Sequence, residues 1–435
     1  MSHPAGRLLK AVSGSLGGAD VSTLRAVYAA LRRSQVALRH RRMAIGIYEH
    51  ALHVVGGSQK YFATLAAALQ DRFDVTYIAN EDLDLAKVGA WYGLDLSRCR
   101  LRIVPLPFFR GRRWIDSSLV TAKVQNPFDA VARASADYDV FVNASMLEKV
   151  RPLAPLSLFV CHFPDVLPRA YFGAHEYTLL VASSRYASSW IRRRWGLATS
   201  MLLYPPIDAR GPALAKDRII LSVARFEPAG SKKQLEMVEA FRALRSAAPG
   251  PMAGWRLVLL GGSVPDNVYL ERVRAAAGRE GAAIEVRANV PFDELLNWYG
   301  RASIFWHACG LDEHEPQLVE HFGMTTAEAM QNGCAPVVID GGGQREIVEH
   351  GVSGFRFRAL DEMCSWTLRL VGNTALRSSI QQQARRRSEL FGRAAFETAG
   401  GRLFDLLRRE YSTLPPGDLD ELQRRFRVDS APRGG

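Results

Sequence analysis

The sequence predicts an α/β protein with two doubly wound domains, each a mainly parallel sheet covered by helices. At 435 residues the chain is long enough to bury more than one core. Short apolar runs alternate with helical patterns along most of its length, which is typical of parallel sheets with helices on both faces. A Pro- and Gly-containing segment at residues 204–212 separates two such series, which indicates a domain boundary.

The first domain is expected at residues 43–208. It opens with an apolar strand at 43–48, a loop, and a helix at 58–69 that has apolar residues on one face. Further strands are expected at 74–79, 140–143, 157–162 and 178–182, and a helix near 186–194.

The second domain is expected at residues 209–412. Its predicted strands are 218–224, 255–261, 283–287, 303–307 and 335–339, each followed by a loop or a helical pattern. Residues 413–435 are rich in Pro, Arg and Asp and are predicted to be a mobile tail.

Composition indicates an ordinary globular protein, with 48% hydrophobic and 23% charged residues. No apolar run approaches the roughly 20 residues that a membrane-spanning helix needs, and the first residues lack a signal-peptide core. Five scattered cysteines without a CxxC pair predict reduced thiols in a cytosolic protein.

Positive charge is concentrated at the N-terminus. The net charge is +12, and residues 1–42 hold eight Lys or Arg against one Asp. Further basic clusters lie at 110–113 and 192–194. Within the extension, residues 22–40 have a helical apolar stripe flanked by arginines, which favours docking on an anionic membrane surface. The alternatives are a solubilising arm, a stripe that packs on the first domain, or another anionic partner.

The most informative stretch is EHFGMTTAEAMQNGCAPVVIDGGGQREIVEHGVSGF, residues 320–355. It places Glu320 and Glu328 on either side of a glycine-containing loop. A helix is predicted at 325–332, with Thr325 or Thr326 as N-cap and Gly333 as its stop. A helix start preceded by glycine offers backbone amides to phosphate, and the two carboxylates can accept sugar hydroxyls. These features together indicate a nucleotide sugar.

The segment resembles the donor-binding signature of family 4 glycosyltransferases, retaining enzymes of the GT-B fold. The longer run from His307 is similar to the mannosyltransferases of lipid-linked oligosaccharide assembly, and the resemblance extends over about residues 43–391. It implies two Rossmann-like domains facing across a cleft, the first binding the acceptor and the second the nucleotide sugar. Glu320 would contact the donor sugar and Glu328 the ribose. The backbone around the following residues would touch sugar and phosphates: Phe322, Gly323, Met324 and Thr325.

Two other junctions are candidates for phosphate and sugar binding. Gly56 and Gly57 open a helix after the first strand, where the backbone can approach a ligand; Ser58 follows where family members often carry an acid. Arg225 and Lys232 lie where the family places one Arg and one Lys to neutralise the diphosphate, with Lys233 as an alternative to Lys232.

Remaining candidates are individual residues near strand ends. By resemblance, His162 would point toward the reacting sugar, and Asp165 is a weaker neighbour. Residues from Arg287 to Val290 would contact the base through their backbone. His307 and Gly310 could line the pocket. His314 and His321 lie among acids, but their irregular spacing and the lack of a DxD motif argue against a metal site.

The sequence therefore predicts a cytosolic, retaining hexosyltransferase that requires neither metal nor other cofactor and is peripheral on the inner face of a membrane. It would use a GDP- or UDP-sugar as donor and a hydroxyl of a growing glycan or glycolipid as acceptor, as in polysaccharide biosynthesis. The alternatives are a nucleotide-sugar epimerase or phosphorylase of similar fold, and a non-catalytic nucleic-acid-binding protein. Nucleic acid is not expected as a partner because the basic residues lack interleaved aromatics.

Overall fold

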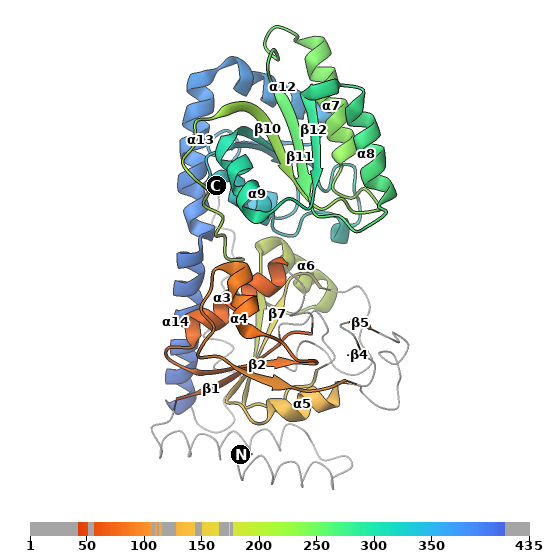
Figure 1. The fold of residues 1–435 in the computed structure, drawn as a ribbon. Helices are drawn as coiled ribbons and strands as arrows, with labels where there is room; N and C mark the ends of the chain where they lie inside the picture. The colour runs from red at the N-terminus through yellow and green to blue at the C-terminus, as the bar shows by residue number, and fades with distance from the viewer. Residues whose placement is uncertain are drawn as a thin grey trace. The chain divides into compact units, whose positions relative to one another are not determined.

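The computed structural model describes residues 42–50, 56–106, 109–110, 113–114, 128–143, 150–164, 174 and 177–413. The chain divides into two compact units (Figure 1). Among the described residues, the first unit comprises those up to Pro206 together with those from Phe396 onward, and the second is Ile207–Ala395. The predicted extension up to residue 41, Asp165 and the predicted tail beyond Thr413 lie outside the described residues.

The first unit is built on a seven-stranded parallel sheet of order β3-β2-β1-β6-β7-β8-β9. Its strands are β1 Ala44–Tyr48, β2 Asp74–Ala79, β3 Arg100–Ile103, β6 Val140–Asn143, β7 Leu156–Cys161, β8 Leu179–Ala182 and β9 Met201–Leu202. A small antiparallel pair is added by β4 Phe109–Arg110 and β5 Arg113–Trp114. The helices are α3 Gly57–Leu69, α4 Leu85–Tyr92, α5 Asp129–Ser135 and α6 Arg185–Trp195.

Both faces of this sheet are buried, as expected for near-continuous apolar strands. On one face Ile45 and Ile47 of β1 pack with α3 and α4. On the other face Phe141 of β6 and Phe159 of β7 pack with α5 and α6. The alternation along each strand therefore fills two separate cores.

The second unit has a six-stranded parallel sheet of order β12-β11-β10-β13-β14-β15. Its strands are β10 Asp217–Val223, β11 Arg256–Gly261, β12 Ile284–Ala288, β13 Ala302–His307, β14 Ala335–Ile339 and β15 Phe355–Phe357. The α-helices are α7 Gln234–Ala247, α8 Val268–Gly278, α9 Phe292–Arg301, α10 Met324–Gln331, α11 Gln344–Ile347, α12 Leu360–Gly372 and α13 Thr374–Ser388. The last helix, α14 Arg393–Thr413, begins in this unit and continues into the first. Short 3-10 turns are η3 Gly281–Ala283, η4 Pro316–Leu318 and η5 Glu389–Phe391.

Helices cover this second sheet on both sides too. Leu257 and Leu259 of β11 face α7, α8 and α12, whereas Val258 and Leu260 face α9 and α10. Figure 1 shows α7 and α8 beside each other along the sheet, with α9 apart from them. The predicted pair of doubly wound α/β domains is therefore confirmed.

The predicted second domain ran to residue 412, but α14 departs from that boundary. Phe396, Leu403, Phe404 and Leu407 of α14 are buried in the core of the first unit, beside α3. The chain thus passes from one unit to the other at Pro206 and again at Ala395. Sequence periodicity predicts that a helix is amphipathic but does not identify the sheet that its apolar face will cover.

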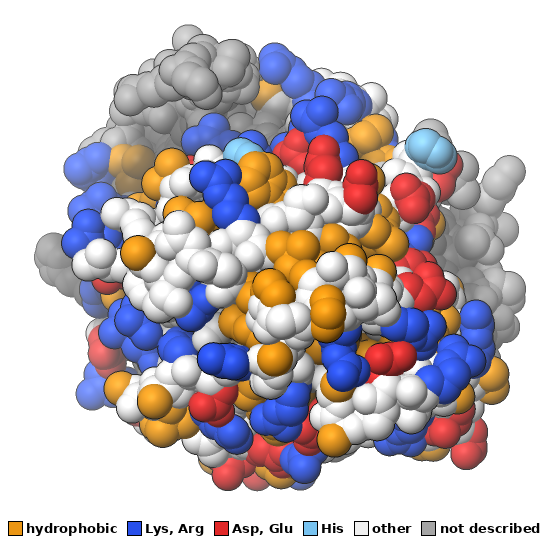
Figure 2. Space-filling model, turned by 90° about the horizontal axis from the view of Figure 1, so that it is seen from above, with side chains coloured by type: hydrophobic (Ala, Val, Ile, Leu, Met, Phe, Trp, Pro, Cys, Tyr) orange, Lys and Arg blue, Asp and Glu red, His pale blue; other side chains and the backbone are white. Residues whose placement is uncertain are grey.

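Within the described part of the chain, no helix is long and apolar enough to cross a membrane. The five cysteines are free thiols. On the face drawn in Figure 2, basic and acidic side chains are interspersed, and no single basic patch dominates it.

Candidate active site

The residues that the sequence singled out in the second unit gather beyond the carboxyl ends of β10, β13 and β14. The strand order reverses between β10 and β13, because β10 is flanked by β11 on one side and β13 on the other. In doubly wound sheets, ligands bind at such a switch point. Lys232 follows β10, His307 ends β13, and Glu320 lies in the loop between β13 and α10.

Lys232, Glu320 and His307 form one contact cluster. Lys232 Nζ lies 3.0 Å from Glu320 Oε2, and His307 Nε2 lies 3.3 Å from the same oxygen. Cys309 Sγ lies 3.4 Å from Lys232 Nζ. His307 is buried, whereas the side chains of Lys232 and Glu320 are 18% and 21% exposed. A fixed carboxylate and a fixed ammonium therefore remain accessible.

Electrostatics keeps both groups charged. Burial alone would raise the pKa of Glu320, but the hydrogen bond from His307 and the positive charge of Lys232 hold it well below the usual range. Burial would lower the pKa of Lys232, and the carboxylate of Glu320 raises it above its usual value instead. Burial and Glu320 raise the pKa of the Cys309 thiol to about 11, so that thiol stays neutral.

The glycine triple at 341–343 holds the loop that carries Glu320. The amide of Gly343 donates to the carbonyl of Glu320 at 2.9 Å. A Cβ at Gly342 would lie 2.1 Å from that carbonyl oxygen, and a Cβ at Gly343 would lie 2.3 Å from Phe322 Cα. These glycines are therefore needed for two backbones to pack together. Phe322 itself is buried and packs edge-on against Phe391 at 5.5 Å.

The N-terminus of α10 differs from the prediction in its cap. Gly323, with φ of 111°, is the N-cap, and no side chain caps the helix. The prediction of Thr325 or Thr326 as N-cap is wrong because the helix already begins at Met324. The Thr326 hydroxyl is buried and makes no hydrogen bond to any described residue. A left-handed N-cap favours glycine, and the first amides of α10, from Met324 and Thr325, have no intrahelical acceptor.

Glu328 lies one turn further into α10. The helix ends at Gln331, one residue before the predicted end, with Asn332 as C-cap, and Gly333 follows in the left-handed region with φ of 72°. The hydroxyl of Tyr299, on α9, donates to Glu328 Oε2 at 3.0 Å. Burial and the Glu328 carboxylate together raise the Tyr299 pKa well above its usual value, so Tyr299 remains a donor. No sequence pattern pointed to Tyr299, because the contact joins two helices separated by β13.

The three predicted cations after β10 have different surroundings. Arg225 is 77% exposed on its side chain and pairs with Glu227 at 2.8 Å. Lys233 Nζ pairs with Glu313 Oε1 at 2.7 Å. Lys233 is also the N-cap of α7, with φ of 60°. Of these three side chains, Lys232 is the one that contacts Glu320. This contact distinguishes Lys232 from Lys233, which pairs with Glu313 instead.

Arg287 and Val290 lie at the end of β12 and in the following loop. Arg287 pairs with Glu285 at 2.6 Å and with Glu294, and its guanidinium lies 5.8 Å from the Trp298 ring. Hydrogen bonding by Glu294 and the charge of Glu285 raise the Arg287 pKa. Val290 packs partly buried against the core under α9. The side chain of Arg287 is thus held among surface carboxylates.

The predicted residues of the first unit also lie together. His162 Nε2 lies 3.2 Å from the hydroxyl of Ser58, in the first turn of α3, and Gly57 is the first residue of that helix. Gly56 precedes it with an extended backbone. The hydroxyl of Tyr92 bonds both the amide and the carbonyl of Gly56, at 3.0 and 3.2 Å. The Gly56 amide, expected to face a ligand, is therefore already engaged.

Other histidines and loop residues can also be placed. Gly310, with φ of 105°, turns the chain after β13, where a Cβ would lie 3.1 Å from a Val319 methyl. His314 is exposed and His321 half-buried. Within the residues that the structure describes, no group of three or more His, Cys, Asp or Glu is arranged to hold a metal ion.

Comparison with known proteins connects this geometry to a protein class. Residues 206–387 match the model of the family described as Glycosyl transferases group 1. This range includes the cluster around Glu320. The matched domain lies almost wholly in the second unit, and the two-domain α/β fold is that of GT-B glycosyltransferase structures.

Within that class the chain resembles mannosyltransferases. It is 24% identical over 286 residues to a GDP-Man:Man(3)GlcNAc(2)-PP-Dol alpha-1,2-mannosyltransferase of Xenopus laevis, covering 62% of this chain and 56% of the relative. It is 28% identical over 252 residues to the Alpha-1,3/1,6-mannosyltransferase ALG2 of Rhizomucor pusillus, covering 45% and 54%. The chain spans about half the length of the curated relatives it matches.

Solved structures share the fold at low sequence identity. A glycosyltransferase from Rickettsia africae has a TM-score of 0.65 at 14% identity, covering 86% of this chain and all of that one. Anabaena HepE in complex with UDP-glucose has a TM-score of 0.60 at 15% identity, covering 83% and 99%.

Proposed function

We propose that this protein is a retaining glycosyltransferase that moves a hexose from a nucleoside diphosphate sugar to a hydroxyl of a growing glycan or glycolipid. The observation that carries the proposal is the Lys232–Glu320–His307 cluster at the switch point of the second sheet. It supplies a cation for a diphosphate and a carboxylate for sugar hydroxyls within 3.0 Å of each other. The mannosyltransferase relatives support a hexose, and mannose is the first donor sugar to test.

The donor would be held by the second unit. The free amides at the start of α10 and the ammonium of Lys232 would bind the diphosphate, since both offer positive charge in a partly enclosed site. Glu320 would accept hydrogen bonds from the transferred sugar. Glu328, oriented by Tyr299, would accept those of the ribose.

Catalysis in this scheme depends on stabilising the departing diphosphate. Lys232 already has its charge fixed by Glu320, so it needs little reorganisation as negative charge develops on the leaving group. Arg225 is exposed and its bond to Glu227 is solvent-accessible, so its guanidinium can exchange that partner for phosphate at small cost. No acidic nucleophile stands out, and front-side attack by the acceptor hydroxyl is the simplest retaining mechanism. The scheme uses no metal or other cofactor.

His162 would act in the first unit. Its bond to Ser58 fixes the imidazole near the start of α3, beside Gly56 and Gly57. We assign it a hydrogen bond to the donor sugar during transfer. The acceptor would bind this unit, and a lipid-linked acceptor would place the protein on the cytoplasmic face of a membrane.

The proposal is tested with the purified full-length chain. Nucleoside diphosphate sugars, including GDP-mannose, UDP-glucose and UDP-N-acetylglucosamine, are first screened for protection against thermal unfolding. The stabilising donor is then incubated with glycan and glycolipid acceptors, and proton NMR of the product gives its anomeric configuration. The product is expected to retain the anomeric configuration of the donor sugar, and Glu320→Gln should form much less of it. An inverted product, or no stabilisation by any nucleotide sugar, would contradict the proposal.

Metal dependence is measured in the same assay. Turnover should survive prior treatment with EDTA. A strict requirement for a divalent ion in donor binding would contradict the scheme.

A further inference from the structure

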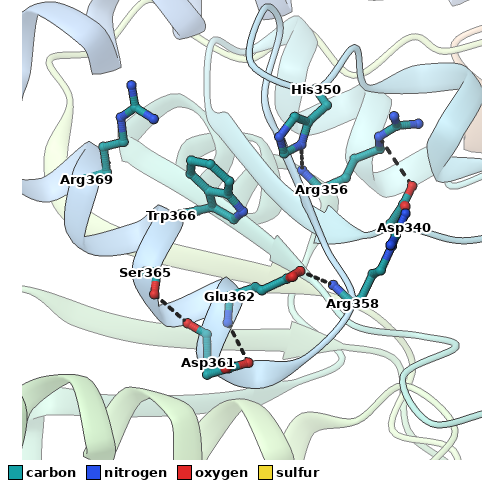
Figure 3. Close-up of a pocket in the computed structure, with 9 residues that line it drawn as sticks. All are labelled: Asp340, His350, Arg356, Arg358, Asp361, Glu362, Ser365, Trp366 and Arg369. Carbon is teal, nitrogen blue, oxygen red and sulfur yellow. Dashed lines mark hydrogen bonds and ion pairs between the residues drawn. The ribbon is translucent and has the colours of Figure 1, made fainter.

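A pocket that includes no residue of the Lys232–Glu320–His307 cluster lies at the edge of the second sheet. It is formed by the end of β14, by β15 and by the first turns of α12, with a volume of about 560 Å³. Its lining residues are Asp340, His350, Arg356, Arg358, Asp361, Glu362, Ser365, Trp366 and Arg369 (Figure 3). A pocket of this size fits a small organic molecule.

The charges of this edge pocket balance. Three lining residues are carboxylates and three are arginines. Asp340 pairs with Arg356 at 3.4 Å and with Arg358 at 3.2 Å. Arg345, just outside the lining, pairs with it at 3.0 Å. Burial raises the Asp340 pKa, but these arginines lower it below the usual range, so the carboxylate stays ionised.

This balance excludes strongly charged ligands. Asp361 and Glu362 lie in the first turn of α12, where they would repel an anion. Arg358 and Arg369 would repel a cation on the same lining. A neutral ligand meets neither penalty and can use both kinds of group, because the carboxylates accept hydrogen bonds and the guanidiniums donate them.

An aromatic wall completes the lining. Trp366 stacks on Phe355, with ring centroids 4.5 Å apart and planes 7° apart. His350 meets the indole edge-on at 5.2 Å, and the Arg369 guanidinium lies 5.7 Å from the ring centroid. In Figure 3 the indole lies between Arg369 on one side and His350 and Arg356 on the other. The stack fixes a rigid apolar surface among polar groups at low entropic cost.

We propose that the edge pocket is a non-catalytic binding site for a neutral carbohydrate of one or two sugar units. A sugar ring has an apolar C–H face that matches the fixed indole. Its hydroxyls both donate and accept, and so can satisfy the alternating arginines and carboxylates. The site goes beyond the proposed transfer reaction and uses none of its residues.

The test compares sugars of the same shape but different charge on the full-length protein. Methyl α-mannoside, maltose and glucose are the neutral probes, glucuronate is the anion and glucosamine is the cation. Binding is followed by isothermal titration and saturation-transfer NMR, with an expected dissociation constant of about 1 mM for the best neutral probe. Equal or tighter binding of glucuronate or glucosamine would overturn the assignment.

Variants locate the bound sugar. Glu362→Ala and Arg369→Ala should each weaken binding by about tenfold, as expected for a lost hydrogen bond to a charged group. Trp366→Ala should abolish sugar binding. Thermal melting shows whether this variant remains folded. If it is unfolded, the results for Glu362→Ala and Arg369→Ala, whose side chains are exposed, decide the question. Arg386→Ala, on the exposed face of α13, is the matched control and should bind as the wild type does.

The transfer site must be excluded as the place of binding. Sugar binding that is unchanged in Glu320→Gln and about tenfold weaker in Glu362→Ala supports the edge pocket. The reverse pattern places the sugar at the transfer site and overturns the inference. If no neutral sugar binds while donor turnover is normal, the inference fails and the proposed function stands.

Discussion

Replacing Lys232 by methionine, which has similar volume and no charge, tests the central ion pair. At 3.0 Å and an effective dielectric constant of about 20, two unit charges attract by about 5.5 kcal/mol. Removing one partner of a buried pair costs about 3–5 kcal/mol, because the other charge is left behind. His307 still contacts Glu320, and both side chains are about one-fifth exposed, so we expect a loss of about 3 kcal/mol in the free energy of unfolding.

The neighbouring residue provides a matched control. Lys233 pairs with Glu313 at 2.7 Å, and their side chains are 14% and 20% exposed, close to the values for Lys232 and Glu320. Lys233→Met should therefore lose about as much stability, roughly 3 kcal/mol. Of the two lysine variants, only Lys232→Met should lower kcat/KM by about 10²–10³-fold, because Lys232 is assigned to the diphosphate and Lys233 is not. If the two variants are equally stable but only Lys232→Met loses turnover, then Lys232 acts in catalysis and does more than hold its loop in place.

Urea denaturation at pH 7 gives both stabilities, and initial rates with the identified donor give turnover. The double variant Lys232→Met/Glu320→Gln should recover part of the stability, since no unpaired carboxylate remains. Two results would refute the reasoning. If both lysine variants lose turnover equally, the pairs order the loop and Lys232 has no special role. If neither variant is destabilised, the ion pairs do not form in solution.

Four further predictions follow from the site and from the basic extension. Glu320→Gln should cut turnover with little loss of nucleotide affinity, whereas Glu328→Gln should weaken nucleotide binding itself. Calorimetry measures the affinity and initial rates measure the turnover. If both quantities are unchanged in both variants, the roles assigned to the two glutamates are wrong. The pKa of Glu320 is lowered in the folded state, so its stabilising contribution is present above about pH 4.3 and is lost as pH falls through the folded pKa. The stability difference between wild type and Glu320→Gln should therefore shrink below about pH 4, and a constant difference in acid denaturation would contradict this sign. Gly343→Ala should lower the free energy of unfolding by about 1–3 kcal/mol or more, because the new Cβ would lie 2.3 Å from Phe322 Cα. A variant that melts at the same temperature as the wild type would show that the loop relaxes freely. Full-length protein should sediment with anionic vesicles at low salt, less so at high salt and less so without residues 1–42; equal binding of the truncated form would exclude the extension as an anchor.

Much of the fold could be predicted from local pattern. The strands at Asp74–Ala79, Val140–Asn143 and Ala335–Ile339 lie at their predicted bounds, because buried parallel strands are short apolar runs between clear breaks. The strands β3 Arg100–Ile103 and β15 Phe355–Phe357 were missed. Each is an edge strand of its sheet, is short and contains at least one arginine, so its hydrophobic signal is weak. The C-terminal crossing of α14 was missed because helical periodicity carries no information about the partner.

For the candidate site, local sequence pattern was enough to identify the kinds of chemical groups and the strand ends at which they lie. Two carboxylates around a glycine loop and basic residues after a strand were enough to indicate a nucleotide sugar. The resemblance placed the lysine at Lys232 with Lys233 as the alternative, and the structure adds a physical reason to prefer Lys232, since its ammonium contacts Glu320. Chain order can bring such residues to one edge of a sheet because parallel strands end together.

The partners of those groups, in contrast, could be identified only in the folded chain. The contacts of Tyr299 with Glu328, of Tyr92 with Gly56, and of the glycine triple with the Glu320 loop all join segments that no local pattern connects. The sequence assigned Arg225 and Lys232 the same phosphate-binding role, but in the structure Arg225 pairs with Glu227 and its side chain is exposed. Whether a charged side chain is free for a ligand depends on which other side chains lie within about 4 Å, and chain folding sets that distance.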